Sequence, residues 1–218
     1  MTMIPPDDIA SLRKEYKRGD LIESTIPENP MQLFSEWFIQ AGAMGAIERN
    51  AMILSTVSQD GKPSSRTVLL KGIEAEDFVF FTNYESRKAD EIKQNPYVSL
   101  LFLWLEPERQ VRIEGIASRI SPEASRAYFK SRPRESQLGA WASQQSAIIA
   151  NREELEACYK GMEERFKDQE DIPMPDFWGG YAIAPSSIEF WQGRIGRLHD
   201  RIIYKKNGDT WTQYRLNP

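Results

Sequence analysis

The sequence is poor in the residues that build metal centres and disulfide frameworks. Its 218 residues include one cysteine, Cys158, and one histidine, His199. A single cysteine excludes an internal disulfide and suits a reducing compartment, so we expect a cytoplasmic protein. One thiol and one imidazole cannot form a thiol-based metal site, and we expect no metal. The chain also has no excess of positive charge. Its net charge of −4 argues against general nucleic-acid binding.

Long apolar runs and nucleotide-binding glycine motifs are missing too. The longest apolar run, residues 98–105, is far too short to cross a bilayer and reads as a buried strand. The first ten residues show no signal-peptide pattern. The chain has no Gly-x-Gly-x-x-Gly after a strand and no Walker A motif, which argues against a dinucleotide fold or an NTPase. We therefore expect a small-molecule partner, and neither nucleic acid nor a membrane.

The elements that the sequence predicts are mostly strands joined by short turns. Hydrophobic residues make up 40% of the chain, enough for a core. The Asp60-Gly61 pair predicts a hairpin turn. We expect strands at residues 51–58, 64–71, 78–82, 97–105, 109–120, 181–184, 187–191, 197–206 and 211–216, and helices at 7–18, 31–44, 86–94, 121–130 and 151–167. This order predicts a mainly antiparallel sheet or barrel with peripheral helices, an α+β fold.

The run FWQGRIGRLHDR holds the only histidine between two arginines. If residues 197–203 form a strand, alternation places Arg197, His199 and Arg201 on one face. Arginine donates in a planar fork and stacks on rings, and histidine can move a proton near neutral pH. Beside Trp191, such a face would suit a flat anionic ligand. The alternative is an exposed strand with a solvated charged face.

Two basic segments are candidates for binding phosphate. Arg66 and Lys71 can reach one ligand only if their strand ends or bulges near Gly72. Further on, Ser86 is the expected N-cap of a helix whose first turn carries Arg87 and Lys88. Cations are unfavourable at a helix N-terminus, and a bound phosphate there would offset that cost. Solvated surface cations are the alternative in both places.

A third candidate lies where the helix at residues 121–130 ends. Tyr128 and Arg132 are one helical turn apart, and Pro133 makes Ser136 a loop residue. Two hydroxyls and a guanidinium can cradle a phosphate. An ordinary helix C-terminus with favourable cations is the alternative.

The segments Ile188–Gln192 and Arg197–Arg201, four residues apart, resemble the signature of the pyridoxine (pyridoxamine) 5′-phosphate oxidase family. The resemblance runs from residues 12–16 to residues 215–218. It implies one FMN-binding split β-barrel domain over residues 1–218, which is a homodimer with flavin at the subunit interface. It also implies a mobile N-terminal segment, residues 1–20, and a C-terminal part, residues 171–218, that carries the signature and dimer-interface residues.

The resemblance also implies roles for individual residues. Arg197 and His199 are the expected catalytic residues. The expected substrate-binding residues are Arg13, Tyr16, Lys71, Tyr128, Arg132, Ser136, Arg197, Leu198 and His199. The expected FMN-binding residues are Arg66, Thr67, Val68, Leu69, Leu70, Lys71, Phe81, Thr82, Arg87, Lys88, Gln110, Gln145, Ser146, Trp191 and Arg201.

The implied activity is oxidation of pyridoxamine or pyridoxine 5′-phosphate to pyridoxal 5′-phosphate. A hydride would pass from the substrate's C4′ to flavin N5, and O₂ would be reduced to H₂O₂. Two alternatives stay open, because a fold alone does not fix function. One is a non-catalytic protein that binds flavin or pyridoxal phosphate, and the other is a flavin reductase that uses a nicotinamide donor.

Overall fold

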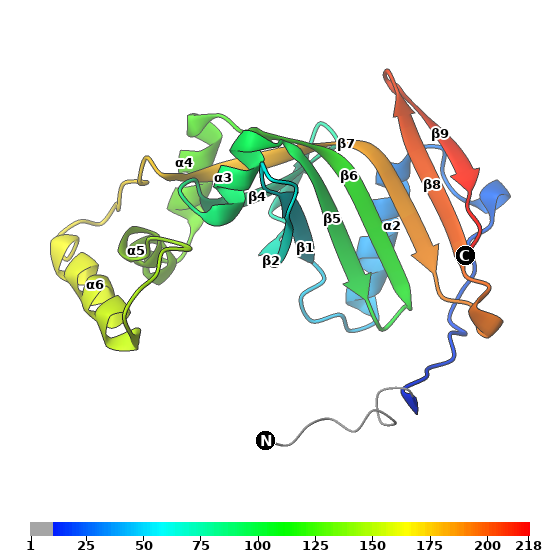
Figure 1. Cartoon of the computed structure of the whole chain (residues 1–218), viewed down its shortest axis with the longest axis horizontal. Coiled ribbons are helices and arrows are strands. Elements are labelled where there is room, and N and C mark those ends of the chain that lie inside the picture. The colour runs from blue at the N-terminus through cyan, green and yellow to red at the C-terminus, as the bar shows by residue number, and fades with distance from the viewer. Residues whose placement is uncertain (1–10) are drawn as a thin grey trace. The chain divides into compact units, whose positions relative to one another are not determined.

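The computed structural model describes residues 11–218, which form two compact units (Figure 1). One unit comprises residues 11–49, 102–112 and 187–218, and the other comprises residues 50–101 and 113–186. We call them the terminal unit and the central unit, and describe each by itself. Among the described helices, none is long and apolar enough to cross a membrane.

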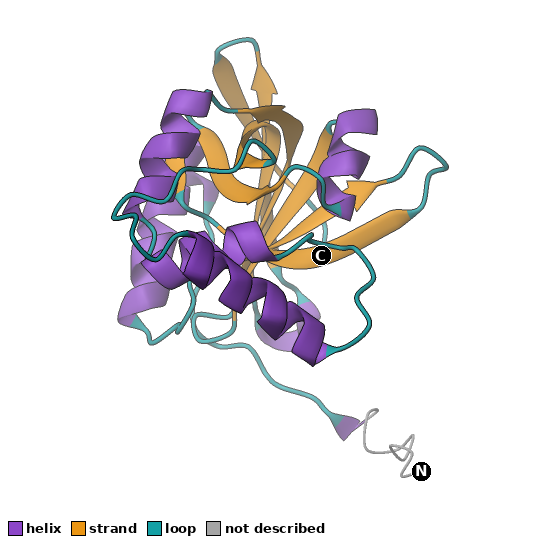
Figure 2. Ribbon diagram, turned by 90° about the vertical axis from the view of Figure 1, so that its left-hand side faces the viewer, coloured by secondary structure: helices purple, strands orange, loops and turns teal. Residues whose placement is uncertain are grey.

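The central unit is organised by antiparallel strand pairs (orange in Figure 2). Its strands are β1 (Ala51–Val57), β2 (Pro63–Leu69), β3 (Gly72–Glu74), β4 (Asp77–Asn83) and parts of β5 (Tyr97–Trp104), β6 (Arg109–Arg119) and β7 (Trp178–Gln192). The sheet order is β2-β1-β5-β6-β7-β4-β3. The predicted hairpin is confirmed, with Gly61 at φ 80° in its turn.

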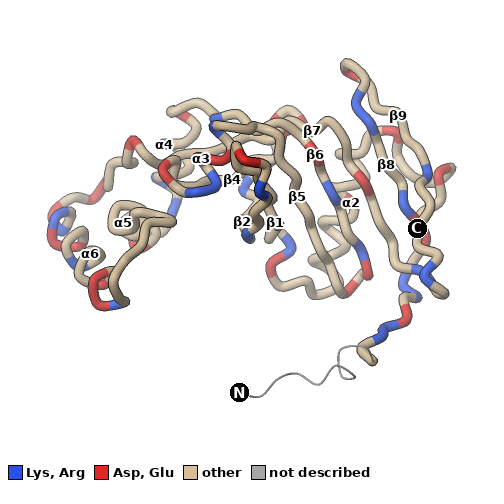
Figure 3. The backbone as a smooth tube through the Cα atoms, in the orientation of Figure 1, with Lys and Arg blue, Asp and Glu red and all other residues tan. Residues whose placement is uncertain are grey.

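Four helices belong to the central unit: α3 (Arg87–Gln94), α4 (Pro122–Ser131), α5 (Arg134–Ala142) and α6 (Arg152–Arg165). Ser121 caps α4, because its Oγ accepts the N–H of Ala124 at 3.0 Å. Both charge signs alternate along α6 (Figure 3), while Tyr159 and Met162 pack against a buried cluster. That cluster consists of Phe129, Leu138, Phe166, Ile172 and Trp178.

The terminal unit holds α2 (Pro30–Ala43), two short 3₁₀ turns, η1 (Glu23–Thr25) and η2 (Ile195–Arg197), and the hairpin of β8 (Asp200–Asn207) and β9 (Thr210–Arg215). The apolar face of α2 packs on strand residues, with Phe34 5.1 Å from Phe102 and Trp37 5.2 Å from Phe190 between ring centroids. Near its end, Arg215 donates to both Glu23 carboxylate oxygens and to Asp200.

Several predicted boundaries need correction. The helix expected at residues 7–18 is wrong for residues 12–18, which are not helical, and residues 7–10 lie outside the described part of the chain. The two strands expected around Pro185 are one strand, β7. It pairs with β4 up to Ile183 and with β8 from Ser187, so Pro185 lies between the two ladders, where its missing N–H breaks neither.

Candidate functional site

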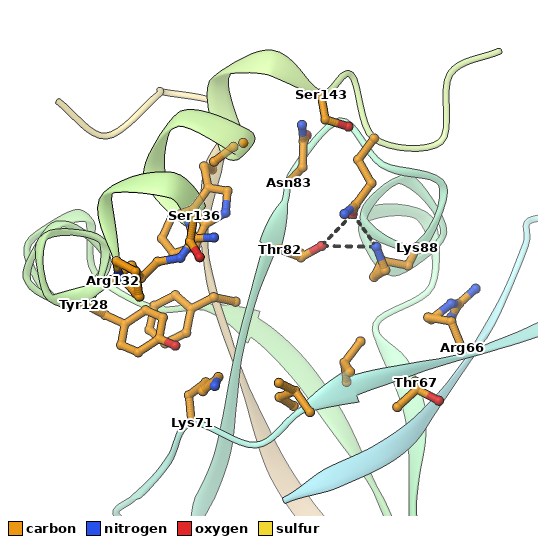
Figure 4. Close-up of a pocket in the computed structure, with 18 residues that line it drawn as sticks. Arg66, Thr67, Lys71, Thr82, Asn83, Lys88, Tyr128, Arg132, Ser136 and Ser143 are labelled. Carbon is orange, nitrogen blue, oxygen red and sulfur yellow. Dashed lines mark hydrogen bonds between the residues drawn. The ribbon is translucent and has the colours of Figure 1, made fainter. Parts of the chain in front are cut away.

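The central unit contains a cavity of about 760 Å³, a size typical of small-molecule sites. Predicted cofactor- and substrate-binding residues line it: Arg66, Thr67, Val68, Leu69, Lys71, Phe81, Thr82, Lys88, Tyr128, Arg132, Ser136 and Gln145. Because β2 ends at Leu69, the condition that lets Arg66 and Lys71 face one ligand is met. In Figure 4, Arg66 and Lys88 lie across the cavity from Arg132 and Tyr128, with Lys71 below Tyr128.

Lys88 is a buried cation with neutral partners. Its Nζ lies 3.1 Å from Thr82 Oγ1 (Figure 4). It also lies 2.6 Å from Gln145 Oε1 and 3.2 Å from Ser86 Oγ. Burial, and then the nearby Arg66 guanidinium, lower the pKa of Lys88 to about 8. An anion that enters beside this ammonium would stabilise its charged form.

A buried carboxylate holds the arginines near Lys88. Glu91 accepts from Ser64 Oγ at 2.6 Å, from Arg87 Nε at 2.8 Å and from Thr56. Burial acts to raise the pKa of Glu91, but these hydrogen bonds outweigh it and lower that pKa to about 2. The ionised carboxylate also lies 3.3 Å from Arg66 Nη2, and so fixes this guanidinium at the cavity wall.

Arg132 ends α4 with a donor left over. Its guanidinium carbon lies 4.7 Å from the Trp178 ring centroid, and its buried Nη1 has no hydrogen-bond partner among the described residues. Burial lowers the pKa of Arg132. A buried guanidinium donor without an acceptor is costly unless a ligand supplies one, so this position fits an anion.

Tyr128, Lys71 and Ser136 lie on the Arg132 side of the same cavity. The Tyr128 ring stacks on Phe81 at 3.9 Å between centroids and 16° between planes. Ser136 is not the predicted loop residue. Pro133 opens a new helix, α5, whose first turn contains Ser136, because a proline that ends one helix also suits the start of the next.

Three of the predicted FMN-binding residues of the central unit do not line this cavity. Leu70 is buried, whereas Arg87 and Ser146 line a second cavity of about 550 Å³. The Arg87 N–H donates to Ser146 Oγ at 3.2 Å, so α3 begins against the loop that carries Gln145. The predicted N-cap, Ser86, precedes α3, although its hydroxyl donates to Asn83 O instead of capping the helix.

In the terminal unit, three aromatic rings meet. The ring centroids of Trp191 and His199 lie 4.6 Å apart, and Tyr16 lies 5.6 Å from each of them. The Arg194 N–H donates to His199 Nδ1 at 3.1 Å. Burial and the neighbouring Arg197 lower the pKa of His199. Because Nδ1 accepts this hydrogen bond, the proton of the neutral imidazole is on Nε2.

The predicted strand at residues 197–203 is wrong in its first part. Strand β8 begins at Asp200, and Arg197 lies in η2 with φ 62°. Gly196 also has a left-handed backbone, at φ 67°, and strand alternation does not apply to a turn of this kind. Arg197, His199 and Arg201 are therefore not presented by one strand face. Leu198, another predicted substrate contact, is exposed in the same connection, as is Arg13 near the start of the described residues.

Arg201 and Trp191 are direct partners in the β7–β8 ladder. Arg201 Nε donates to Glu189 Oε1 at 2.8 Å, and Arg112 binds the other oxygen of this buried carboxylate. The hydrogen bond that Arg201 donates to Glu189 raises the pKa of Arg201. Gln110, the remaining predicted cofactor residue, also belongs to the terminal unit, in β6.

Sequence reasoning missed several residues of these two sites. Asn83, Ser143 and Trp178 line the large cavity. Glu91 binds Arg66 at the wall of that cavity, and Glu189 binds Arg201 in the terminal unit. Trp178, before two glycines at the start of β7, carried a usable signal. The two glutamates were missed because most of their partners lie far away in the sequence, although Arg87 is only four residues from Glu91.

Two family models match most of the chain. A family model described as pyridoxamine 5′-phosphate oxidase matches residues 43–165. A second model, described as the pyridoxine 5′-phosphate oxidase C-terminal dimerisation region, matches residues 178–218.

Similar proteins match nearly the whole chain. A pyridoxine/pyridoxamine 5′-phosphate oxidase of Leptospira biflexa serovar Patoc is 52% identical over 97% of this chain and 100% of its own length. The protein of that name from Rubrobacter xylanophilus is 53% identical over 97% of both chains. Among solved structures, PhzG from Burkholderia lata 383, in complex with tetrahydrophenazine-1-carboxylic acid, has a TM-score of 0.85 at 27% identity. That match covers 93% of this chain and 100% of PhzG.

Proposed function

Because the chain belongs to the pyridoxamine 5′-phosphate oxidase family, we propose that it oxidises pyridoxamine or pyridoxine 5′-phosphate to pyridoxal 5′-phosphate, with FMN as its cofactor. The fold class is the predicted one, a mainly β split barrel with helices. We further propose that residues 1–218 act as one domain and that the protein is cytoplasmic. We also propose a homodimer, which agrees with the match to a dimerisation region.

The observation that carries the proposal is a pair of cations in one cavity, neither of which has an acidic partner among the described residues. Lys88 is a buried ammonium with neutral acceptors, and Arg132 has a buried donor without one. A flavin mononucleotide and a phosphorylated substrate would bring one phosphate to each. The cavity residues therefore fit FMN as well as the substrate.

Each side of the cavity has its own task in this proposal. Lys88, with Arg66 beside it, holds the phosphate of FMN. Lys71, Tyr128, Arg132 and Ser136 hold the 5′-phosphate of the substrate. This division would reject vitamers that lack a phosphate, because a buried donor without its acceptor costs binding free energy.

The proposal also assigns ligand contacts to residues of the terminal unit. Arg197 and His199 hold the pyridine ring, and Trp191 and Arg201 close over the cofactor. Since the Trp191 and His199 rings lie 4.6 Å apart in one chain, the same subunit supplies both pairs. When bound, FMN supplies the two-electron acceptor whose reduced form reacts with O₂ to give H₂O₂. The chain's own contribution is then alignment of the substrate carbon that is oxidised, and no protein nucleophile is required.

The test is an absorbance spectrum of the purified protein before and after pyridoxamine 5′-phosphate is added without oxygen. We expect a yellow protein with two FMN per dimer that the substrate bleaches, and H₂O₂ formation when air is admitted. Colourless protein that FMN cannot reconstitute would contradict the proposal. Bound flavin that is reduced only by NADH would indicate a flavin reductase, and flavin that nothing reduces would indicate a binding protein.

A further inference from the structure

Glu108, in the turn between β5 and β6, is an unusual residue for its position. Its backbone has φ 61°, a left-handed conformation that is strained for a side chain of this kind, and it is 4% exposed. The buried carboxylate accepts two backbone N–H groups through Oε2, from Lys17 at 2.7 Å and from Arg18 at 3.1 Å. Lys14 Nζ lies 3.4 Å from its other oxygen.

The backbone of Glu108 holds a second segment. Its carbonyl accepts the N–H of Gly193 at 2.9 Å and Nε2 of Gln192 at 3.3 Å. Gln192 is fully buried, and its Oε1 accepts from Arg109 Nε at 2.8 Å. One residue therefore joins two parts of the chain, positions 17–18 and positions 192–193.

These two parts carry the aromatic cluster of the terminal unit. Tyr16 directly precedes the amides that Glu108 binds, and its ring contacts Trp191 and His199. Gly193 makes room for it, because a Cβ at that position would lie 2.6 Å from Cγ of Tyr16. The Tyr16 ring therefore lies where the two segments that Glu108 joins meet.

We propose that Glu108 is a positioning residue, which binds the Lys17 and Arg18 amides and thereby holds Tyr16 against His199 over the substrate. The inference rests on the proposed function, in which Tyr16 and His199 contact the substrate. Burial acts to raise the pKa of Glu108, but the N–H donors of Lys17 and Arg18 outweigh it and lower that pKa. The carboxylate is therefore ionised at neutral pH, as a charged acceptor must be.

The experiment compares Glu108→Gln and Glu108→Gly with the wild-type holoenzyme. Glu108→Gln keeps the shape but removes the charge. Glu108→Gly removes the side chain and tolerates φ 61°, so its fold should be retained. The matched control is Glu106→Gln, an exposed glutamate in the same turn.

Two measurements are made on each protein: hydrogen exchange of the Lys17 and Arg18 amides, and steady-state oxidation of pyridoxamine 5′-phosphate. In both Glu108 variants we expect these amides to exchange at least about tenfold faster, as befits loss of a charge-assisted hydrogen bond. KM should rise by about tenfold while kcat and FMN content stay near wild type, the pattern of lost binding. Glu106→Gln should match the wild type in both measurements.

Unchanged amide exchange in both Glu108 variants would overturn the inference, because the segment would then be held by other contacts. Faster exchange with an unchanged KM would overturn it as well, since Tyr16 would not serve the substrate. A wild-type protein without oxidase activity would overturn the proposed function and the inference with it. If the wild type is active and the Glu108 variants have the same KM as the wild type, the inference is overturned and the proposed function stands.

Discussion

The backbone N–H of Arg194 donates to Nδ1 of His199 at 3.1 Å, and this bond decides which ring nitrogen can face a ligand. Since Nδ1 accepts, Nε2 carries the proton of the neutral ring. In the proposed function, His199 would therefore act on the substrate by donating a hydrogen bond from Nε2. This relationship gives the first of five testable predictions.

His199→Asn should lower kcat/KM for pyridoxamine 5′-phosphate by about 10- to 150-fold, the loss expected for one hydrogen bond to a charged group. The asparagine can still accept the Arg194 N–H, but its shorter side chain does not replace Nε2. Anaerobic stopped-flow reduction of the bound flavin measures the effect. Wild-type rates of reduction together with wild-type substrate affinity would show that His199 is structural.

FMN affinity should fall as the pH rises through about 8. Above that value the free site holds Lys88 largely as the neutral amine, and a bound phosphate must return the proton. Flavin fluorescence titrations measure this affinity at each pH. Binding near pH 8.5 should also take up a proton, which isothermal titration calorimetry in two buffers of different ionisation enthalpy can detect. Lys88→Met should bind FMN weakly at every pH, and a pH dependence that survives in this variant would assign the effect to another group.

The stability of the apoprotein should show the opposite trend. The pKa of Lys88 is lowered from 10.5 to about 8 in the folded chain, so between these values the unfolded chain binds more protons. The free energy of unfolding must then rise with pH across this window. Urea titrations of the apoprotein at pH 7.5, 8.5 and 9.5 would measure the rise as the difference between wild type and Lys88→Met, and equal slopes in the two proteins would refute it.

Arg132→Ala should weaken apparent substrate binding by about 10- to 150-fold and leave FMN content near normal, because it removes the donor assigned to the substrate phosphate. Arg126→Ala is the control, an exposed arginine of the same helix that pairs with Glu123. Steady-state kinetics and the flavin-to-protein absorbance ratio give both values. Loss of flavin with normal substrate affinity would show that Arg132 binds the phosphate of FMN and not that of the substrate.

Arg201→Ala should release FMN, whereas Arg112→Ala should release much less. Both arginines bind the buried Glu189, but only Arg201 pairs with Trp191 across the ladder. Equilibrium dialysis measures how much FMN each variant binds. Both variants remove one hydrogen-bond partner of Glu189, so a larger loss in Arg201→Ala would show a contact between Arg201 and the cofactor. Equal losses in the two would mean that the carboxylate, not Arg201, matters.

Much of the fold follows from local patterns in the sequence. The Asp60-Gly61 turn, the Ser121-Pro122 helix start and the apolar face of α2 all depend on neighbours within a few residues, and each was predictable. The cavity residues Arg66, Lys88 and Arg132 were found through residue types at characteristic spacing and through family resemblance.

What the sequence could not supply was long-range electrostatics and turn geometry. The amides that Glu108 binds lie 90 and 91 positions away in the sequence, and no local pattern around Glu108 predicts these contacts. Arg197 reads as a strand residue, yet the chain turns left-handed there and delays β8 until Asp200. Such a conformation is uncommon for arginine, and local propensity therefore points away from it.

The pair of hydrogen bonds that Arg215 donates to Glu23 affects the order in which the chain can fold during synthesis. The two residues are 192 positions apart, and Asp200, which Arg215 binds as well, accepts the amide of Leu21. As the chain leaves the ribosome N-terminus first, the segment around Leu21 and Glu23 waits without these partners until almost all of the remaining residues are made. The segment around Leu21 and Glu23 is thus among the first parts to leave the ribosome and gains these partners only when synthesis is nearly complete.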